Sequence, residues 1–180
     1  MKNRDELLQR ALALRGTPAL KDGALVAART ALAWLFIYHG GGTLFGAFHG
    51  PGISRQAAFF STYAGLHPGT FFAYLNGLTE FFGGLALAFG LMSRMAAFGL
   101  VCDMIIAMIT VTWGNGIVSS AVGSGYELNV ALAALAVVIV LFGAGRISLD
   151  YLVGTWWSKR HAAQLQTAPP APQAASTPAS

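Results

Sequence analysis

The chain has 180 residues, of which 55% are hydrophobic and 10% carry charge, whereas a typical soluble domain has about 25% charged residues. This composition excludes a soluble globular domain and predicts an integral membrane protein small enough for one helical bundle. The formal net charge of +4 is small, so we interpret it as a determinant of membrane orientation, and we expect no nucleic-acid partner.

The first element is a basic amphipathic stretch over residues 1–22, in which leucines alternate with arginines and lysines. This pattern is typical of a helix lying on the membrane surface, and a partly ordered basic tail fits it equally well.

Residues 23–47 form the first predicted span. Arg29 lies just inside its cytoplasmic end, and His39 near the other end precedes three glycines, which weaken a helix and predict a bend there.

The connection at residues 48–70 is too long for a structureless loop. A turn at Pro51-Gly52 and a capping residue at Ser54 predict a short interfacial or re-entrant helix that runs through Leu66. The sequence does not indicate what this connection does.

The second predicted span, residues 71–91, has one ionisable side chain, Glu80, near its centre. An isolated charge there costs roughly 2.5–3.5 kcal/mol on insertion scales, so we expect Glu80 to face protein or water and not lipid. Gly77 and Gly84 share its helical face. Small residues beside a buried acid predict that a neighbouring helix approaches closely on this face.

The third predicted span, residues 95–113, also has an acid near its centre, Asp103, on a face of small residues. The same argument predicts that this face packs against protein. The fourth predicted span, residues 127–142, begins with Glu127 and Asn129 and is otherwise apolar.

The membrane domain is predicted to end at residue 150, and Ser148 is placed to cap an interfacial helix over residues 151–160. Residues 161–180 are rich in alanine and proline, which is typical of a disordered tail.

Positive charge concentrates on the two ends of the chain and on the turn after the second span, which predicts that both termini are cytoplasmic. The predicted fold class is therefore all-α: an integral membrane four-helix bundle with short interfacial helices.

Counting helical rise places Glu80 and Asp103 at the same depth, about 13–15 Å from the cytoplasmic face. The long side chain of Arg29 can extend toward them, which predicts a buried polar cluster of Arg29, Glu80 and Asp103. Because two acids outnumber one arginine, we expect one carboxyl group to hold a proton. A purely structural ion pair between Arg29 and Glu80, which would fix helix registry, is the alternative.

A second polar layer is predicted nearer the outer face. It consists of Tyr38, His39, Asn76, Glu127 and Asn129. His39 is the only histidine inside a span, so a haem held by two histidines lacks its second ligand, and no metal site is expected. The chain shows no motif for another tightly bound cofactor.

Several short features follow one another from Arg29 to Asp150, over about two thirds of the chain. They are the early arginine itself, His39-Gly40, Asn76-Gly77-Leu78-Thr79-Glu80 with Gly83-Gly84, Gly90-Leu91-Met92-Ser93-Arg94, and Gly143-Ala144-Gly145-Arg146-Ile147-Ser148-Leu149-Asp150. In this order and spacing the chain resembles the DoxX family of small four-helix membrane proteins. It departs from the family in one respect, because members often have a lysine soon after the His-Gly pair, where this chain has Gly41, Gly42 and Thr43.

The resemblance implies a multi-pass protein of the bacterial cytoplasmic (inner) membrane. Some members are linked to thiosulfate:quinone oxidoreduction or to complexes with soluble redox enzymes. The first hypothesis is therefore the membrane subunit of a redox system, in the lipid bilayer, that binds a quinone or small apolar ligand near the acidic cluster. A soluble redox partner would then supply electrons.

Two other functions are compatible with the sequence. The protein could be a non-catalytic scaffold that anchors a soluble enzyme through its basic N-terminal segment or its C-terminal helix. It could also be a small-molecule or proton carrier, although no inverted repeat of broken spans is evident. The sequence does not decide whether the chain is an enzyme, and it leaves the oligomeric state open.

Overall fold

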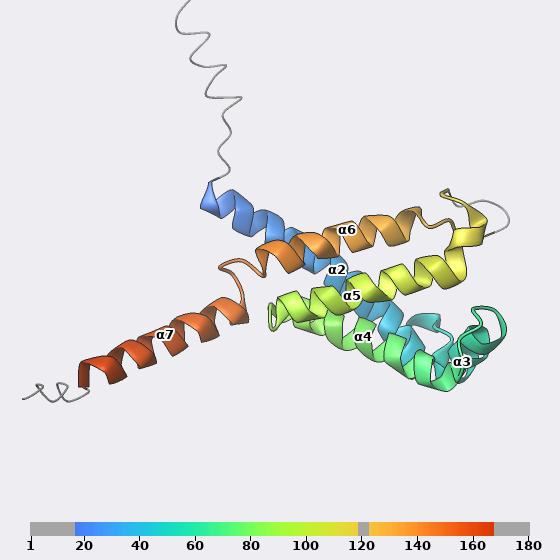
Figure 1. Ribbon diagram of the computed structural model, residues 1–180, viewed down its shortest axis with the longest axis horizontal. Helices are drawn as coiled ribbons and strands as arrows, with labels where there is room; N and C mark the ends of the chain where they lie inside the picture. Colours follow the sequence, from blue (N-terminus) through green and yellow to red (C-terminus); the bar gives the residue numbers. More distant parts are fainter. Residues whose placement is uncertain (1–16, 119–122, 168–180) are drawn as a thin grey trace, which may run out of the picture.

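The computed structural model describes residues 17–118 and 123–167, and every regular element within these ranges is a helix (Figure 1). The protein is thus an all-α membrane bundle, as its composition predicts. Its four bundle helices are α2 (Pro18–Phe45), α4 (Gly69–Phe89), α5 (Ser93–Ala107) and α6 (Glu127–Phe142). α5 continues through a π-helical turn, η2 (Met108–Thr112), and a 3-10 turn, η3 (Trp113–Asn115).

Within the described ranges, length and composition identify two helical units that could each cross a membrane, α4 and the continuous stretch Ser93–Asn115. A third candidate is α2 taken together with the bent segment that follows it. α6 is strongly apolar but has 16 residues, which is short against the roughly 20 that a span requires.

The bundle closes as a ring, because α2 packs along α4, α4 against α5, α5 against α6, and α6 against α2 (Figure 1). Glycines allow α2 and α4 to approach closely. A Cβ atom on Gly40 would overlap the backbone of Phe81, and one on Gly84 would lie 2.9 Å from the Ile37 backbone nitrogen. Gly77 and Gly84 flank the buried Glu80 on the face that meets α2, which is the arrangement that their spacing predicts.

α2 differs from the prediction at both ends. It begins at Pro18, capped by the side chain of Thr17, so the end of the predicted surface segment 1–22 belongs to it, and residues 1–16 lie outside the described ranges. It also continues as a helix through the three glycines to Phe45, so the bend predicted at that point is wrong. The chain turns by 99° at the next residues, where Gly46 adopts a left-handed φ of +64°.

After this bend the chain folds back against the end of α2. η1 (Ala47–His49) leads to Gly50, whose Cα packs so closely on Gly42 that no side chain fits there. α3 (Gly52–Thr62) then lies against α4 (Figure 1). The short helix was predicted, but not its limits: it begins before Ser54, which therefore does not cap it, and it ends four residues before Leu66.

Three segments meet at the other end of the bundle: the start of α2, the α4–α5 turn and the connection from α6 to α7 (Leu149–Thr167). Ser148 caps α7 by accepting a hydrogen bond from the Tyr151 backbone nitrogen at 3.2 Å. α7 includes the predicted helix 151–160 and continues beyond it to Thr167, so the first part of the predicted tail is helical. α7 extends away from the bundle (Figure 1).

Candidate functional site

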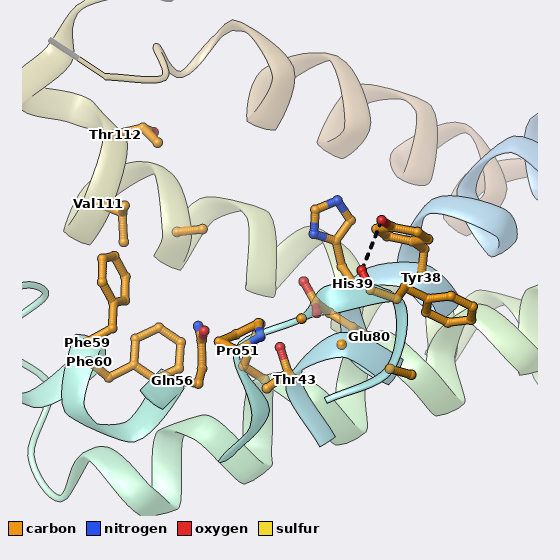
Figure 2. A pocket seen from close by; sticks show the side chains of 16 residues that line it. Tyr38, His39, Thr43, Pro51, Gln56, Phe59, Phe60, Glu80, Val111 and Thr112 are labelled. Carbon is orange, nitrogen blue, oxygen red and sulfur yellow. Dashed lines mark hydrogen bonds between the residues drawn. The ribbon is translucent and has the colours of Figure 1, made fainter. Parts of the chain in front are cut away.

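Glu80 is buried halfway along α4, with 8% of its surface exposed, and it lines a cavity of about 270 Å³ (Figure 2). The walls come from α2, from residues 46–51 after its bend (the fold-back segment), and from α3, α4 and α5 with its continuation η2. Polar side chains on this wall, besides Glu80, are Tyr38, His39, Thr43, Gln56, Asn76 and Thr112. Large apolar side chains on it are Phe48, Phe59, Phe60 and Val111. The cavity therefore combines aromatic walls with several polar groups directed at one space.

The fold-back segment is fastened to α2 beside this cavity. The Tyr38 hydroxyl donates a hydrogen bond to the Phe48 carbonyl oxygen at 3.2 Å, and the two rings stack with centroids 4.9 Å apart (Figure 2). Phe48 and His49 have φ angles of +54° and +63°, in the left-handed region that large side chains rarely adopt. Such backbone conformations persist where surrounding contacts enforce them, and they cluster at ligand sites.

Asn76 binds one of the two intramembrane acids. Its Nδ2 donates a hydrogen bond to Asp103 Oδ1 at 3.0 Å, across the α4–α5 interface. Glu80 follows one helical turn later on the same face of α4 and lines the same cavity as Asn76. Glu80 and Asp103 thus lie close enough to interact electrostatically, as their equal predicted depth suggested.

Arg29 does not join these acids, which corrects the predicted three-residue cluster. Its guanidinium donates to the carbonyl oxygens of Ala144 at 2.9 Å and Ile147 at 3.0 Å. It therefore fastens the α6–α7 connection to the start of the bundle, where Asp150 is its electrostatic partner. The physical reason is that the backbone carbonyl groups of the α6–α7 connection lack helical partners and lie within hydrogen-bond reach of the guanidinium.

The predicted second layer divides into two groups. Tyr38, His39 and Asn76 line the same cavity as Glu80, so they belong to one site with it. Asn129 lies between α5 and α6, where its Oδ1 accepts from the Thr112 hydroxyl at 3.3 Å. Glu127 begins α6, and its backbone nitrogen donates to the Ile117 carbonyl oxygen at 3.0 Å. Neither of the last two lines the cavity.

Several cavity residues were not found from the sequence, among them Thr43, Gln56, Phe59 and Phe60. Three of these come from α3, whose position depends on the bend at Gly46 and on the contact between Gly50 and Gly42. The apolar run in the connection was visible in the sequence, but no local signal indicates which way a re-entrant helix turns.

The cavity is suited to a small head group with an aromatic face. Its volume lies just below the roughly 300–1,000 Å³ of typical small-molecule sites, so a single ring fits better than a large cofactor. Amide, imidazole and carboxyl groups could bind the polar atoms of such a ring. Within residues 17–118 and 123–167, no three histidine, cysteine or acidic side chains gather as a metal site would require.

Comparison with known families gives two matches. A family model described as DoxX matches residues 24–113, from α2 to the end of α5 and its continuation, and one described as TQO small subunit DoxD matches residues 70–167, from α4 through α7. No curated protein and no solved structure matches the chain.

Proposed function

The chain belongs to the DoxX family of membrane proteins, and from this premise we propose that it is the membrane subunit of a redox system and holds a quinone head group in the cavity beside Glu80. The observation that carries the proposal is a buried carboxyl group that faces an aromatic-walled cavity. The description of the second matching family, a small subunit of TQO, fits the link to thiosulfate:quinone oxidoreduction that the resemblance implies.

A bound quinone would supply two-electron, two-proton chemistry, and the residues of this chain would manage its position and its protons. His39 and Gln56 supply polar groups for the ring oxygens, while Phe59 and Phe60 form an apolar wall that excludes water. Glu80 is the group placed to exchange a proton with a ring oxygen. Electrons would come from a soluble redox enzyme, because the chain has no motif of its own for an electron carrier.

We place the protein in the bacterial cytoplasmic membrane with both termini on the cytoplasmic side. In the described part of the chain, the end of the bundle that holds the α4–α5 turn also carries most of the positive charge. Lys21, Arg94 and Arg146 lie at or near this end, and Arg55 lies in α3 at the opposite end. An excess of lysine and arginine marks the cytoplasmic side of a membrane protein.

Binding is tested by melting the purified protein in detergent with and without decylubiquinone. A ligand that binds only the folded state raises the melting temperature, and we expect such a rise. 1-Decanol, which has the chain but no ring, is the ligand control. His39→Ala should reduce the rise, whereas Thr110→Val, which removes an η2 hydroxyl bonded to the Ile106 carbonyl oxygen of α5, should not. Equal shifts with decanol and decylubiquinone would exclude a ring-specific site.

Proton transfer is tested in membranes that contain the redox partner. Glu80→Gln keeps a hydrogen-bonding side chain but cannot exchange a proton, so we expect quinone reduction to fall about 10²–10⁴-fold at an unchanged protein level. Full activity of this variant would remove Glu80 from the chemistry.

One observation favours the scaffold alternative. α7 extends away from the bundle, and Leu152, Val153, Trp156 and Trp157 each expose half or more of their surface (Figure 1). If the protein only anchors an enzyme, Trp156→Ala with Trp157→Ala should release that enzyme from the membrane while the melting response to decylubiquinone is absent in every variant. If the redox proposal holds, the melting response persists in this double variant.

A further inference from the structure

We propose that a second cavity, between α4 and α5, binds a small apolar molecule that carries one hydrogen-bond donor and enters from the hydrocarbon of the bilayer. This cavity has a volume of about 210 Å³ and lies beside Asp103. The inference goes beyond the quinone site and does not depend on it.

The lining of the second cavity is apolar except at a few points. Phe72 and Leu75 of α4 and Ile106 of α5 provide much of the wall, and Asp103 is its only acid. Leu75 and Ile106 expose 47% and 46% of their surfaces on the outside of the bundle. Because lipid covers that outer surface in a membrane, the mouth of the cavity opens to hydrocarbon and admits molecules dissolved there.

The space exists because α5 has small residues at this level. A Cβ atom on Gly99 would lie 3.4 Å from Cγ2 of Thr79, so a larger side chain at position 99 would occupy the gap between the helices. Ala107 is a second small residue on the same wall. The close packing of α4 and α5 is therefore interrupted beside an acid. An empty gap there loses van der Waals contacts, which lowers stability unless a ligand fills it.

Asp103 supplies the polar contact that such an occupant needs. Its Oδ1 accepts from Asn76, but Oδ2 is buried and has no hydrogen-bond partner. An unsatisfied buried oxygen lowers stability, and in apolar surroundings it favours any donor that can reach it. The terminal torsion of an aspartate is broad, so a small rotation turns Oδ2 toward the cavity that the side chain already lines.

These features define the chemical class of the ligand. An anion is disfavoured because it would face a carboxyl group, and a pure hydrocarbon would leave Oδ2 without a partner. A neutral ring or short chain with one hydroxyl satisfies both the apolar walls and the oxygen. Three residues line both cavities: Phe60, Asn76 and Ala107. The two sites are therefore neighbours, and Asn76 lies beside an occupant of either one.

The test uses a photoreactive phenol, with a diazirine on a para butyl chain, and the full-length protein in lipid nanodiscs. Mass spectrometry should place the label on residues 72–75 and 99–106. Excess 4-butylphenol should suppress the labelling, and butylbenzene, which has the same shape but no donor, should compete about tenfold less well. Labelling elsewhere, or equal competition by the two compounds, would overturn the proposal.

Two variants separate this site from the first cavity. Asp103→Asn replaces one acceptor with a donor, so the affinity for 4-butylphenol should fall about tenfold and the preference over butylbenzene should vanish. His39→Ala lies in the first cavity only, so labelling should be unchanged. Should Asp103→Asn fail to fold, the comparison of the two compounds on the unaltered protein still decides the question. The melting response to decylubiquinone is scored separately, so either site can fail alone.

Discussion

Asn76 holds α4 to α5 at the polar centre of the molecule, because its amide reaches an acid on the neighbouring helix. It donates to Asp103 across the interface, and Glu80 lies one turn along its own helix. No lysine or arginine among the described residues is seen to pair with either acid, since Arg29 binds carbonyl groups at the end of the bundle. An uncharged amide therefore donates to Asp103, for which the sequence predicted an arginine.

Asn76→Leu should lower the free energy of unfolding by about 0.6–1.7 kcal/mol, which are the average and the maximum measured for hydrogen bonds between membrane helices. Leucine fills a similar volume but leaves Asp103 Oδ1 without its donor. Thr110→Val is the matched control, because the Thr110 hydroxyl bonds only to the Ile106 carbonyl oxygen of its own helix. Unfolding in mixed micelles measures both variants, and equal effects would show that the bridge adds nothing to stability.

At this scale the sequence predicted which two acids lie at the same level of neighbouring helices, but not where the Arg29 side chain points. Residue counting along a helix gives height in the membrane, so the meeting of Glu80 and Asp103 could be predicted. It gives no account of connections, and the carbonyl oxygens that bind Arg29 belong to a segment 115 residues away. Arg29 binds the acceptors that the returning chain brings to it, and these cannot be read from its own helix.

Glycine contacts determine how the elements α2 and α4 pack. The spacing of Gly77, Glu80 and Gly84 predicted a close approach, and the structure places α2 on that face. The low helix propensity of the three glycines of α2 predicts a weak point in the helix. They are instead buried contacts, because tertiary packing outweighs the low intrinsic helix propensity of glycine.

Gly40→Ala should destabilise the protein by roughly 1–3 kcal/mol, the usual cost of overpacking, because the new methyl group overlaps the Phe81 backbone. Gly23→Ala in the same helix has no atom within 4 Å of its new Cβ, so it should be neutral or stabilising by up to about 1 kcal/mol. Melting temperatures of the two variants give the comparison. If both substitutions stabilise the protein, α2 and α4 are farther apart than described.

At the scale of the whole molecule, the distribution of positive charge predicts one orientation, with both termini cytoplasmic. The bend at Gly46 is what composition alone could not supply, because it turns α3 back against α4 and closes the first cavity. The fold class followed from composition and hydrophobic spans, whereas the cavity required a contact between residues of the connection and of α2.

The proposed orientation predicts opposite labelling of two single cysteines in a Cys102→Ser background. Ser158→Cys in α7 should react with a membrane-impermeant maleimide only in inside-out vesicles, and Ser54→Cys in α3 only in right-side-out vesicles. Both positions are exposed on the protein. Labelling of both from the same side would contradict the orientation.

The most direct test of the redox proposal is an electron-density map of the protein crystallised in a lipidic mesophase with a short-chain quinone. The account predicts ring-shaped density in the cavity, with its oxygens within hydrogen-bond distance of His39 or Glu80 and its face against Phe59 or Phe60. A fully occupied quinone bound elsewhere, or a cavity filled by protein side chains, would contradict it.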